Sequence, residues 1–198
     1  MLVTKKAPLF IAPAVLPDGR IINNFDLSKA NGRNGMVIFF WPKDFTFVCP
    51  SEIIAFDNSF AEFQQKGINI IGISTDSDYV HLAWRNIEPS KGGIGKVQFP
   101  LVSDIKKTIS KDYDVLFDES IALRGSFLID KNFTIRHAVI NDLPLGRSID
   151  EMMRMVDALQ FFEANGDVCP ANWKKGKDSI KATPEGIAKY LEKNSKDI

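Results

Sequence analysis

The segment from Phe39 to Glu52 holds one of the two cysteines of this 198-residue chain, Cys49. The apolar run 36–41 that precedes it has the composition of a buried β-strand. The residues that follow repeat large apolar side chains every three or four positions, at Ile53, Phe56, Phe60 and Phe63. This spacing predicts a helix, with Pro50 at its first position, where no N–H partner is needed. Cys49 is therefore expected where a strand leads into a helix.

A thiol at that position lies among unpaired backbone N–H groups, at the positive end of the helix dipole. These surroundings stabilise the thiolate, which is the nucleophile of thiol chemistry. A free cysteine is more often inert packing. Here the polar side chains of Thr46, Ser51 and Glu52 interrupt an aromatic run. Because buried polar groups need partners, they favour a reactive Cys49 over a packing residue.

The second cysteine, Cys169, is too far along the chain for a local Cys-x-x-Cys pair. His81 and His137 show no paired spacing with either cysteine, so no metal site is expected. The N-terminus lacks an apolar signal core, and no apolar run is long enough to span a bilayer. We therefore expect a cytoplasmic protein without membrane contact. Cysteines stay reduced in that compartment, which favours redox-active thiols over a permanent disulfide.

The bulk composition excludes one class of partner. Lysine plus arginine and aspartate plus glutamate each total 25, so the net charge is zero and nucleic acid is not expected as the main partner. The length suits one domain with a terminal extension. At Asp167 the composition changes to a lysine-rich segment, which divides the chain into a domain at 1–166 and a tail at 167–198.

The expected elements alternate between strands and helices. In chain order they are a hairpin at 14–22, strand 36–41, a helix from 49 to about 67, strand 68–74, helix 76–86, strand 97–102, short helix 105–113, strands 123–130 and 134–139, a helix from 148 to about 165, and a helix from 183 to about 194. Strand, helix and strand in succession predict a right-handed parallel β-α-β unit and an α/β fold. His81 is expected at the margin of helix 76–86, without a role.

Two segments resemble a known family. The pattern Pro42-x-x-x-Thr46-x-x-Cys49 matches the active-site motif of the peroxiredoxins. The longer string 44–52 resembles the typical two-cysteine subgroup, the alkyl hydroperoxide reductase C type, except that Ser51 replaces its usual threonine. Segment 168–173, around Cys169, is similar to the resolving-cysteine segment of that subgroup. The resemblance runs from the N-terminal residues through the tail.

The resemblance implies a thioredoxin-like fold, in which helices flank a central mixed sheet and a C-terminal extension follows. It makes Cys49 the peroxidatic nucleophile and Cys169 the resolving cysteine. Three side chains are then expected around the reacting sulfur, with Pro42 shielding it, Thr46 bridging sulfur and peroxide, and Arg124 holding the thiolate. A supporting network of the arginines is expected to include Glu52 and Arg147.

The same resemblance implies a reaction cycle. Hydrogen peroxide or an organic hydroperoxide oxidises Cys49 to a sulfenic acid, which condenses with Cys169 of the partner subunit. A thioredoxin-like dithiol or a flavoprotein then reduces the disulfide, in the service of antioxidant defence. The implied assembly is a homodimer, and further a decamer, without metal or organic cofactor. The residues alone leave open whether the disulfide is intrachain or interchain, and which peroxide is preferred.

Three alternatives compete with the peroxidase. A dithiol oxidoreductase is disfavoured because Glu52 occupies the place of the second cysteine in Cys-x-x-Cys. A structural disulfide protein is disfavoured by the missing signal sequence. A holdase chaperone or peroxide sensor stays open as an added role. The loop 92–95, Gly-Gly-Ile-Gly, resembles one that pairs with a Tyr-Phe helix in members sensitive to over-oxidation, but this chain has Tyr190-Leu191.

Overall fold

The structure is a computed structural model in which residues 1–196 are described. The chain divides into two compact units, Met1–Ile149 and the residues from Asp150 onward. The strands of the first unit are β1 (Ile11–Val15), β2 (Ile21–Asp26), β3 (Gly35–Phe40), β4 (Ile68–Ser74), β5 (Leu101–Ser103), β6 (Leu116–Phe117), β7 (Ile121–Ala122), β8 (Arg124–Asp130) and β9 (Ile135–Asn141). Its α-helices are α1 (Cys49–Asn58), α2 (Phe60–Gln65), α3 (Asp78–Arg85) and α4 (Thr108–Asp112).

Within the described residues, seven of these strands form one sheet in the order β2-β1-β5-β4-β3-β8-β9. The central strand β4 runs parallel to both β3 and β5, whereas the other neighbours are antiparallel. The β3-α1-α2-β4 succession is thus the expected parallel unit. The mixed sheet with flanking helices confirms the predicted α/β class.

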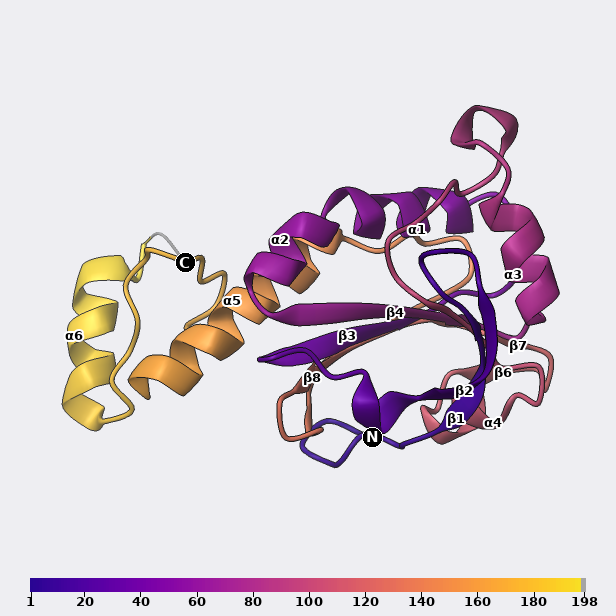
Figure 1. The fold of residues 1–198 in the computed structure, drawn as a ribbon. Helices are drawn as coiled ribbons and strands as arrows, with labels where there is room; N and C mark the ends of the chain where they lie inside the picture. The colour runs from indigo at the N-terminus through magenta and orange to yellow at the C-terminus, as the bar shows by residue number, and fades with distance from the viewer. Residues whose placement is uncertain (197–198) are drawn as a thin grey trace. The chain divides into compact units, whose positions relative to one another are not determined.

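The alternation of side chains along β3 builds a core on each face of the sheet. Phe39 stacks on Phe56 of α1 with ring centroids 4.2 Å apart. Its neighbour Phe40 points to the opposite face, where its ring lies 5.3 Å from that of Tyr113, just after α4. All six residues of β3 are buried. Helices α1 and α2 accordingly run along one face of the sheet, above β3 and β4 in Figure 1.

The helix expected from residue 49 to about 67 is interrupted. It ends at Asn58 and restarts at Phe60, because Ser59 leaves helical geometry with φ −93° and ψ 0°. Serine is a weak helix former, since its hydroxyl competes for backbone groups. The expected end at Gly67 is confirmed. This residue has φ +70°, in the left-handed region that favours glycine after a helix.

Two further expectations are corrected by the tertiary contacts. His81 was expected at the margin of its helix, but its side chain is fully buried in α3. Its two ring nitrogens contact Asp44 Oδ2 at 2.8 Å and the carbonyl of Val102 at 3.2 Å, which satisfies both nitrogens away from water. The strand expected at 97–102 is only the three-residue β5. The short antiparallel pair β6–β7 was not predicted.

The second unit begins in α5 (Ile149–Asn165) and ends in α6 (Pro184–Asn194). Both helices were predicted. The Thr183 side chain caps α6 by accepting a hydrogen bond from the N–H of Gly186 at 3.0 Å. Between the helices, Val168 and Ile180 form an isolated antiparallel bridge. This bridge closes the segment that carries Cys169 into a loop.

Candidate active site

Cys49 is the first residue of α1 and is fully buried. Pro50 therefore takes the second helical position, not the first, and its missing N–H is still harmless there. The sulfur thus lies at the amino end of a helix that begins shortly after the carboxyl end of β3. This is the predicted strand-to-helix position, where backbone dipoles favour negative charge.

The hydroxyl of Thr46 lies between two acceptors. Its oxygen is 3.0 Å from Cys49 Sγ and 2.8 Å from the carbonyl oxygen of Lys43. A hydroxyl has one proton, so it donates to only one of these neighbours at a time. When Cys49 is a thiol, its S–H can donate to Thr46, which donates to Lys43. When Cys49 is a thiolate, Thr46 is free to donate to the sulfur instead.

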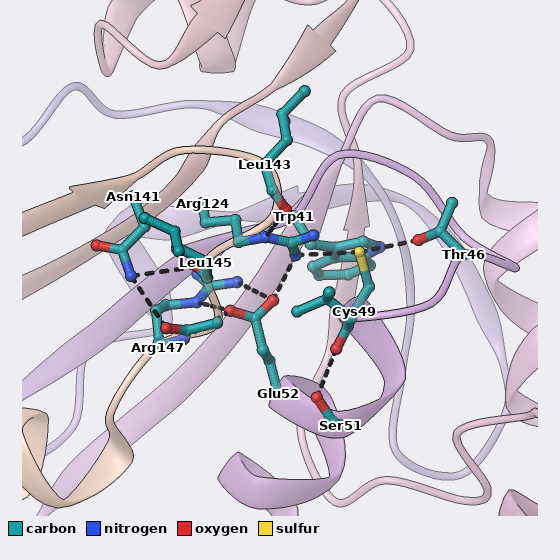
Figure 2. A network of polar contacts seen from close by, with 12 residues as sticks. Trp41, Thr46, Cys49, Ser51, Glu52, Arg124, Asn141, Leu143, Leu145 and Arg147 are labelled. Carbon is teal, nitrogen blue, oxygen red and sulfur yellow. Dashed lines mark hydrogen bonds and ion pairs between the residues drawn. The ribbon is translucent and has the colours of Figure 1, made fainter.

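Arg124, the first residue of β8, reaches Cys49 from a strand 75 residues along the chain. Its Nη1 donates to Cys49 Sγ at 3.3 Å and to Glu52 Oε2 at 2.6 Å, and its Nε donates to the carbonyl of Leu143 at 2.7 Å. Three contacts fix the plane of the guanidinium group against the sulfur, as Figure 2 shows. Its Nη2 makes no hydrogen bond to another described residue, which leaves the two N–H groups of this nitrogen for a further ligand.

Glu52 lies one turn into α1 and binds two arginines. Its Oε1 accepts from the Nε of Arg147 at 2.8 Å and from the backbone N–H of Arg147 at 3.0 Å. Arg147 also donates to the Gly125 carbonyl at 2.8 Å and lies over the Phe39 ring, 5.2 Å from its centroid. The side chain of Asn141 holds the loop before Arg147 by donating to the carbonyl oxygens of Leu145 and Gly146 (Figure 2). These contacts connect α1, β8 and the loop after β9.

The charges of this cluster balance only with a thiolate. The side chains of Glu52, Arg124 and Arg147 are each at most 5 % exposed. Burial lowers the pKa of Arg147, while the Glu52 carboxylate opposes that effect, and an arginine keeps its charge in proteins. Two positive guanidinium groups and one carboxylate leave one positive charge. Since an unpaired buried charge is costly, the arrangement favours a negative Cys49.

A family model described as the AhpC/TSA family matches residues 3–138. The chain belongs to the AhpC/TSA family. A second model, the C-terminal domain of 1-Cys peroxiredoxin, matches residues 158–193. The AhpC/TSA match covers the whole cluster around Cys49 except Arg147 and its loop, and the second model covers Cys169.

Relatives of this AhpC/TSA member are similar over nearly its whole length. An alkyl hydroperoxide reductase C of Helicobacter pylori is 64% identical, with 98% of each chain covered. Peroxiredoxin-1 of Gallus gallus is 49% identical, with 96% of each chain covered. The crystal structure of reduced Plasmodium vivax 2-Cys peroxiredoxin has a TM-score of 0.94 at 48% identity and covers 97% of this chain and 99% of its own.

These similarities confirm three expectations for this AhpC/TSA member. Its fold is the thioredoxin-like fold of the peroxiredoxins. It is an enzyme, a peroxiredoxin, and it reduces peroxides by thiol chemistry. The mechanism is of the two-cysteine kind. The activity of a dithiol oxidoreductase and the role of a structural disulfide protein, two of the alternatives above, are therefore not the primary function of this chain.

The loop that carries Pro42 and Thr46 is anchored by a residue that the sequence reasoning missed. Asp44 accepts from the indole Nε1 of Trp41 at 2.8 Å and contacts His81 Nδ1 at 2.8 Å, and its backbone N–H donates to Asp76 at 2.9 Å. Pro42 is itself buried. An acidic residue inside an apolar, aromatic run was the available signal, because such a carboxylate needs buried partners.

Cys169 belongs to the second unit and is half-buried. Its sulfur lies 3.6 Å from the carbonyl oxygen of Ala158 in α5 and is within range to donate to it. Burial raises the pKa of the Cys169 thiol, and the charge of Arg154 acts against that effect. Of the predicted site residues, four side chains form one cluster with Cys49 in the first unit, namely Thr46, Glu52, Arg124 and Arg147. Cys169 has its own surroundings.

Two kinds of feature are absent from residues 1–196. No three histidine, cysteine, aspartate or glutamate side chains in that range gather as ligands for a metal ion. No helix there is long and apolar enough to cross a bilayer.

Proposed function

We propose that Cys49 is the peroxidatic nucleophile of this peroxiredoxin, acting on hydrogen peroxide and organic hydroperoxides. Its thiolate attacks one oxygen of the peroxide, so that an S–O bond forms while the O–O bond breaks. Cys49 becomes a sulfenic acid, and the departing oxygen takes a proton to become water or an alcohol. The observation that carries this assignment is the buried sulfur that faces both Arg124 and Thr46 at hydrogen-bond distance.

The neighbouring side chains receive distinct roles. Arg124 stabilises the thiolate and offers an N–H of its Nη2 to a peroxide oxygen. Thr46 donates to sulfur or to peroxide as charge moves between them. Pro42 shields the sulfur from water. Glu52 and Arg147 hold Arg124 in its orientation, which is preorganisation and not contact with the reacting atoms.

We propose Cys169 of the partner subunit as the resolving thiol. Its thiolate attacks the sulfenic sulfur of Cys49, an S–S bond forms, and the S–O bond breaks to release hydroxide, which becomes water. The functional division is then a peroxidase domain, 1–166, and a tail, 167–198, that delivers the resolving cysteine. Among the described residues β9 is the last strand of the main sheet, and its Ile140 is exposed, which supports a homodimer because an edge strand can pair with another chain.

The remaining parts of the cycle follow from this chemistry. A thioredoxin-like dithiol protein or a flavoprotein reduces the disulfide by thiol exchange. Such a cycle needs a reducing compartment, and the cytoplasm is one. The dimers assemble further into a decamer. The cycle serves antioxidant defence and cell redox homeostasis.

A non-reducing gel tests the two cysteine roles. The reduced protein and its Cys49→Ser and Cys169→Ser variants each receive one equivalent of hydrogen peroxide. We expect a dimer-sized band for the unchanged protein and for neither variant. A monomer that loses both thiols would make the disulfide intrachain. Two thiols that stay free after peroxide would overturn the assignment.

A mixture of the two variants tests whether the two cysteines of the disulfide come from different subunits. Cys49→Ser and Cys169→Ser chains are denatured together, refolded and then oxidised. In the interchain mechanism, a mixed dimer keeps one complete pair, with Cys49 from one chain and Cys169 from the other, so the dimer-sized band returns. An intrachain mechanism predicts no such band in the mixture. Labelling of Cys169→Ser with a sulfenic-acid reagent checks that Cys49 was oxidised.

A further inference from the structure

One face of α5 contacts the segment that carries Cys169. Arg154, Ala158 and Phe161 follow each other at spacings of four and three, so they lie along one helical face. Arg154 Nη1 donates to the carbonyl of Trp173 at 2.9 Å. The thiol of Cys169 is 3.6 Å from the carbonyl oxygen of Ala158, and the Phe161 and Trp173 rings lie 4.9 Å apart. The helix thus contacts the segment at three levels.

Arg154 is itself held in a fixed orientation. Its Nε and Nη2 donate to the two carboxylate oxygens of Glu151 at 2.6 and 2.7 Å, a bidentate pair one turn earlier on the helix. The remaining terminal nitrogen serves Trp173, whose side chain is only 2 % exposed. The Trp173 indole in turn donates to the carbonyl of Lys177 at 3.1 Å. Arg154 is therefore a rigid positive group beside a tightly packed turn.

The positive charge acts on the cysteine. Burial raises the pKa of the Cys169 thiol, which disfavours the nucleophilic thiolate, and Arg154 lowers it again. The effect is mutual, since the Cys169 charge raises the pKa of Arg154. The catalytic cluster around Cys49 contains two arginines for one thiol, and the guanidinium group that acts on Cys169 is that of Arg154.

We propose that Arg154 is a positioning residue for Cys169, favouring its thiolate by charge and holding its segment through the Trp173 carbonyl. The inference rests on the resolving role proposed for Cys169. In that step the Cys169 thiolate supplies the electron pair of the new S–S bond, and the Cys49 sulfenic group loses hydroxide. A group that keeps Cys169 deprotonated raises the rate of this step and leaves the preceding oxidation of Cys49 unchanged.

Three acidic groups of the second unit have partners of their own. Glu151 is the direct partner of Arg154. Asp167, two residues before Cys169, accepts from the Ser179 hydroxyl at 3.0 Å. Asp178 pairs with Lys193 of α6.

The first experiment titrates Cys169 in a Cys49→Ser background, where it is the only thiol. The rate of alkylation by iodoacetamide is followed against pH, with and without Arg154→Gln. We expect the midpoint to rise by about one pH unit when the charge is removed. Arg154→Lys keeps the charge but loses the planar fork, and should keep the midpoint close to that of the protein with Arg154. An unchanged midpoint in Arg154→Gln would overturn the proposal.

The second experiment follows disulfide formation in protein with both cysteines. After a rapid peroxide pulse, Arg154→Gln should form the disulfide about tenfold more slowly near neutral pH and recover at alkaline pH, while Cys49 is oxidised at the normal rate. Equal slowing at every pH would mean that Arg154 has only a structural role, and would contradict its effect on the Cys169 thiolate. Lys193→Gln, an exposed cation of the same unit, is the matched control. Because the alkylation titration needs no disulfide, it decides this inference even if the resolving role fails.

Discussion

The carboxylate of Glu52 lies 2.6 Å from Nη1 of Arg124, and both side chains are almost fully buried. The same carboxylate binds Arg147 through its other oxygen at 2.8 Å. One residue of α1 therefore orients two arginines that come from β8 and from the loop after β9. The sulfur of Cys49, one turn earlier on α1, faces a guanidinium group that cannot turn away without breaking an ion pair.

We expect Glu52→Gln to slow the oxidation of Cys49 by hydrogen peroxide on the order of ten- to a hundredfold. The amide has nearly the same shape but only one acceptor oxygen and no charge, so the two arginines repel each other without compensation. Stopped-flow measurement of the second-order rate constant checks this. Glu62→Gln, on the exposed surface of α2, is the control and should leave this rate constant unchanged.

The Thr46 hydroxyl contributes a donor that can follow the moving charge. Thr46→Val removes it at nearly constant volume and should lower the peroxide rate constant on the order of a hundredfold, the usual effect of losing one such donor. Thr46→Ser retains the hydroxyl and should keep most of the activity. Equal rate constants for the valine and serine variants would mean that the hydroxyl takes no part in the reaction.

Arg124→Lys is not a conservative change at this position. A lysine ammonium is a single point, so it cannot serve the Leu143 carbonyl, Glu52 and the Cys49 sulfur in one plane. We expect the peroxide rate constant to fall on the order of a hundredfold while the protein stays folded. Arg20→Lys, in an exposed pair with Asp18, provides the comparison. A peroxide rate constant of Arg124→Lys within twofold of that of the unchanged protein would contradict the role of the planar guanidinium group.

His81 stabilises the loop that leads to Cys49. Its replacement by alanine leaves the buried Asp44 without one of its partners and opens a cavity beside Trp41, whose ring lies 5.4 Å from that of His81. We expect the free energy of unfolding to fall by about 3 kcal/mol. Urea denaturation followed by circular dichroism measures it. Glu88→Gln, in an exposed pair with Lys91, should cost less than about 0.5 kcal/mol.

The local properties of the Cys49 segment could be predicted from its sequence. The strand before Cys49, the helix after it and the polar residues among the aromatic ones are encoded within a few positions. A thiol at a helix N-terminus follows from that spacing alone, and so does its affinity for negative charge. The cap of α6 at Thr183 and the turn at Gly67 are local in the same sense.

Only the tertiary structure decided which distant residues share the site. Glu52 meets Arg124 and Arg147 across 72 and 95 residues, because β8 pairs with β3 and places both arginines beside α1. Family resemblance anticipated these residues, but their spacing could not. His81 shows the opposite failure, because its helical position predicted a place at the margin, whereas Asp44 and the carbonyl of Val102 in β5 enclose it. Long-range contacts depend on strand order, and periodicity along the chain carries no information about strand order.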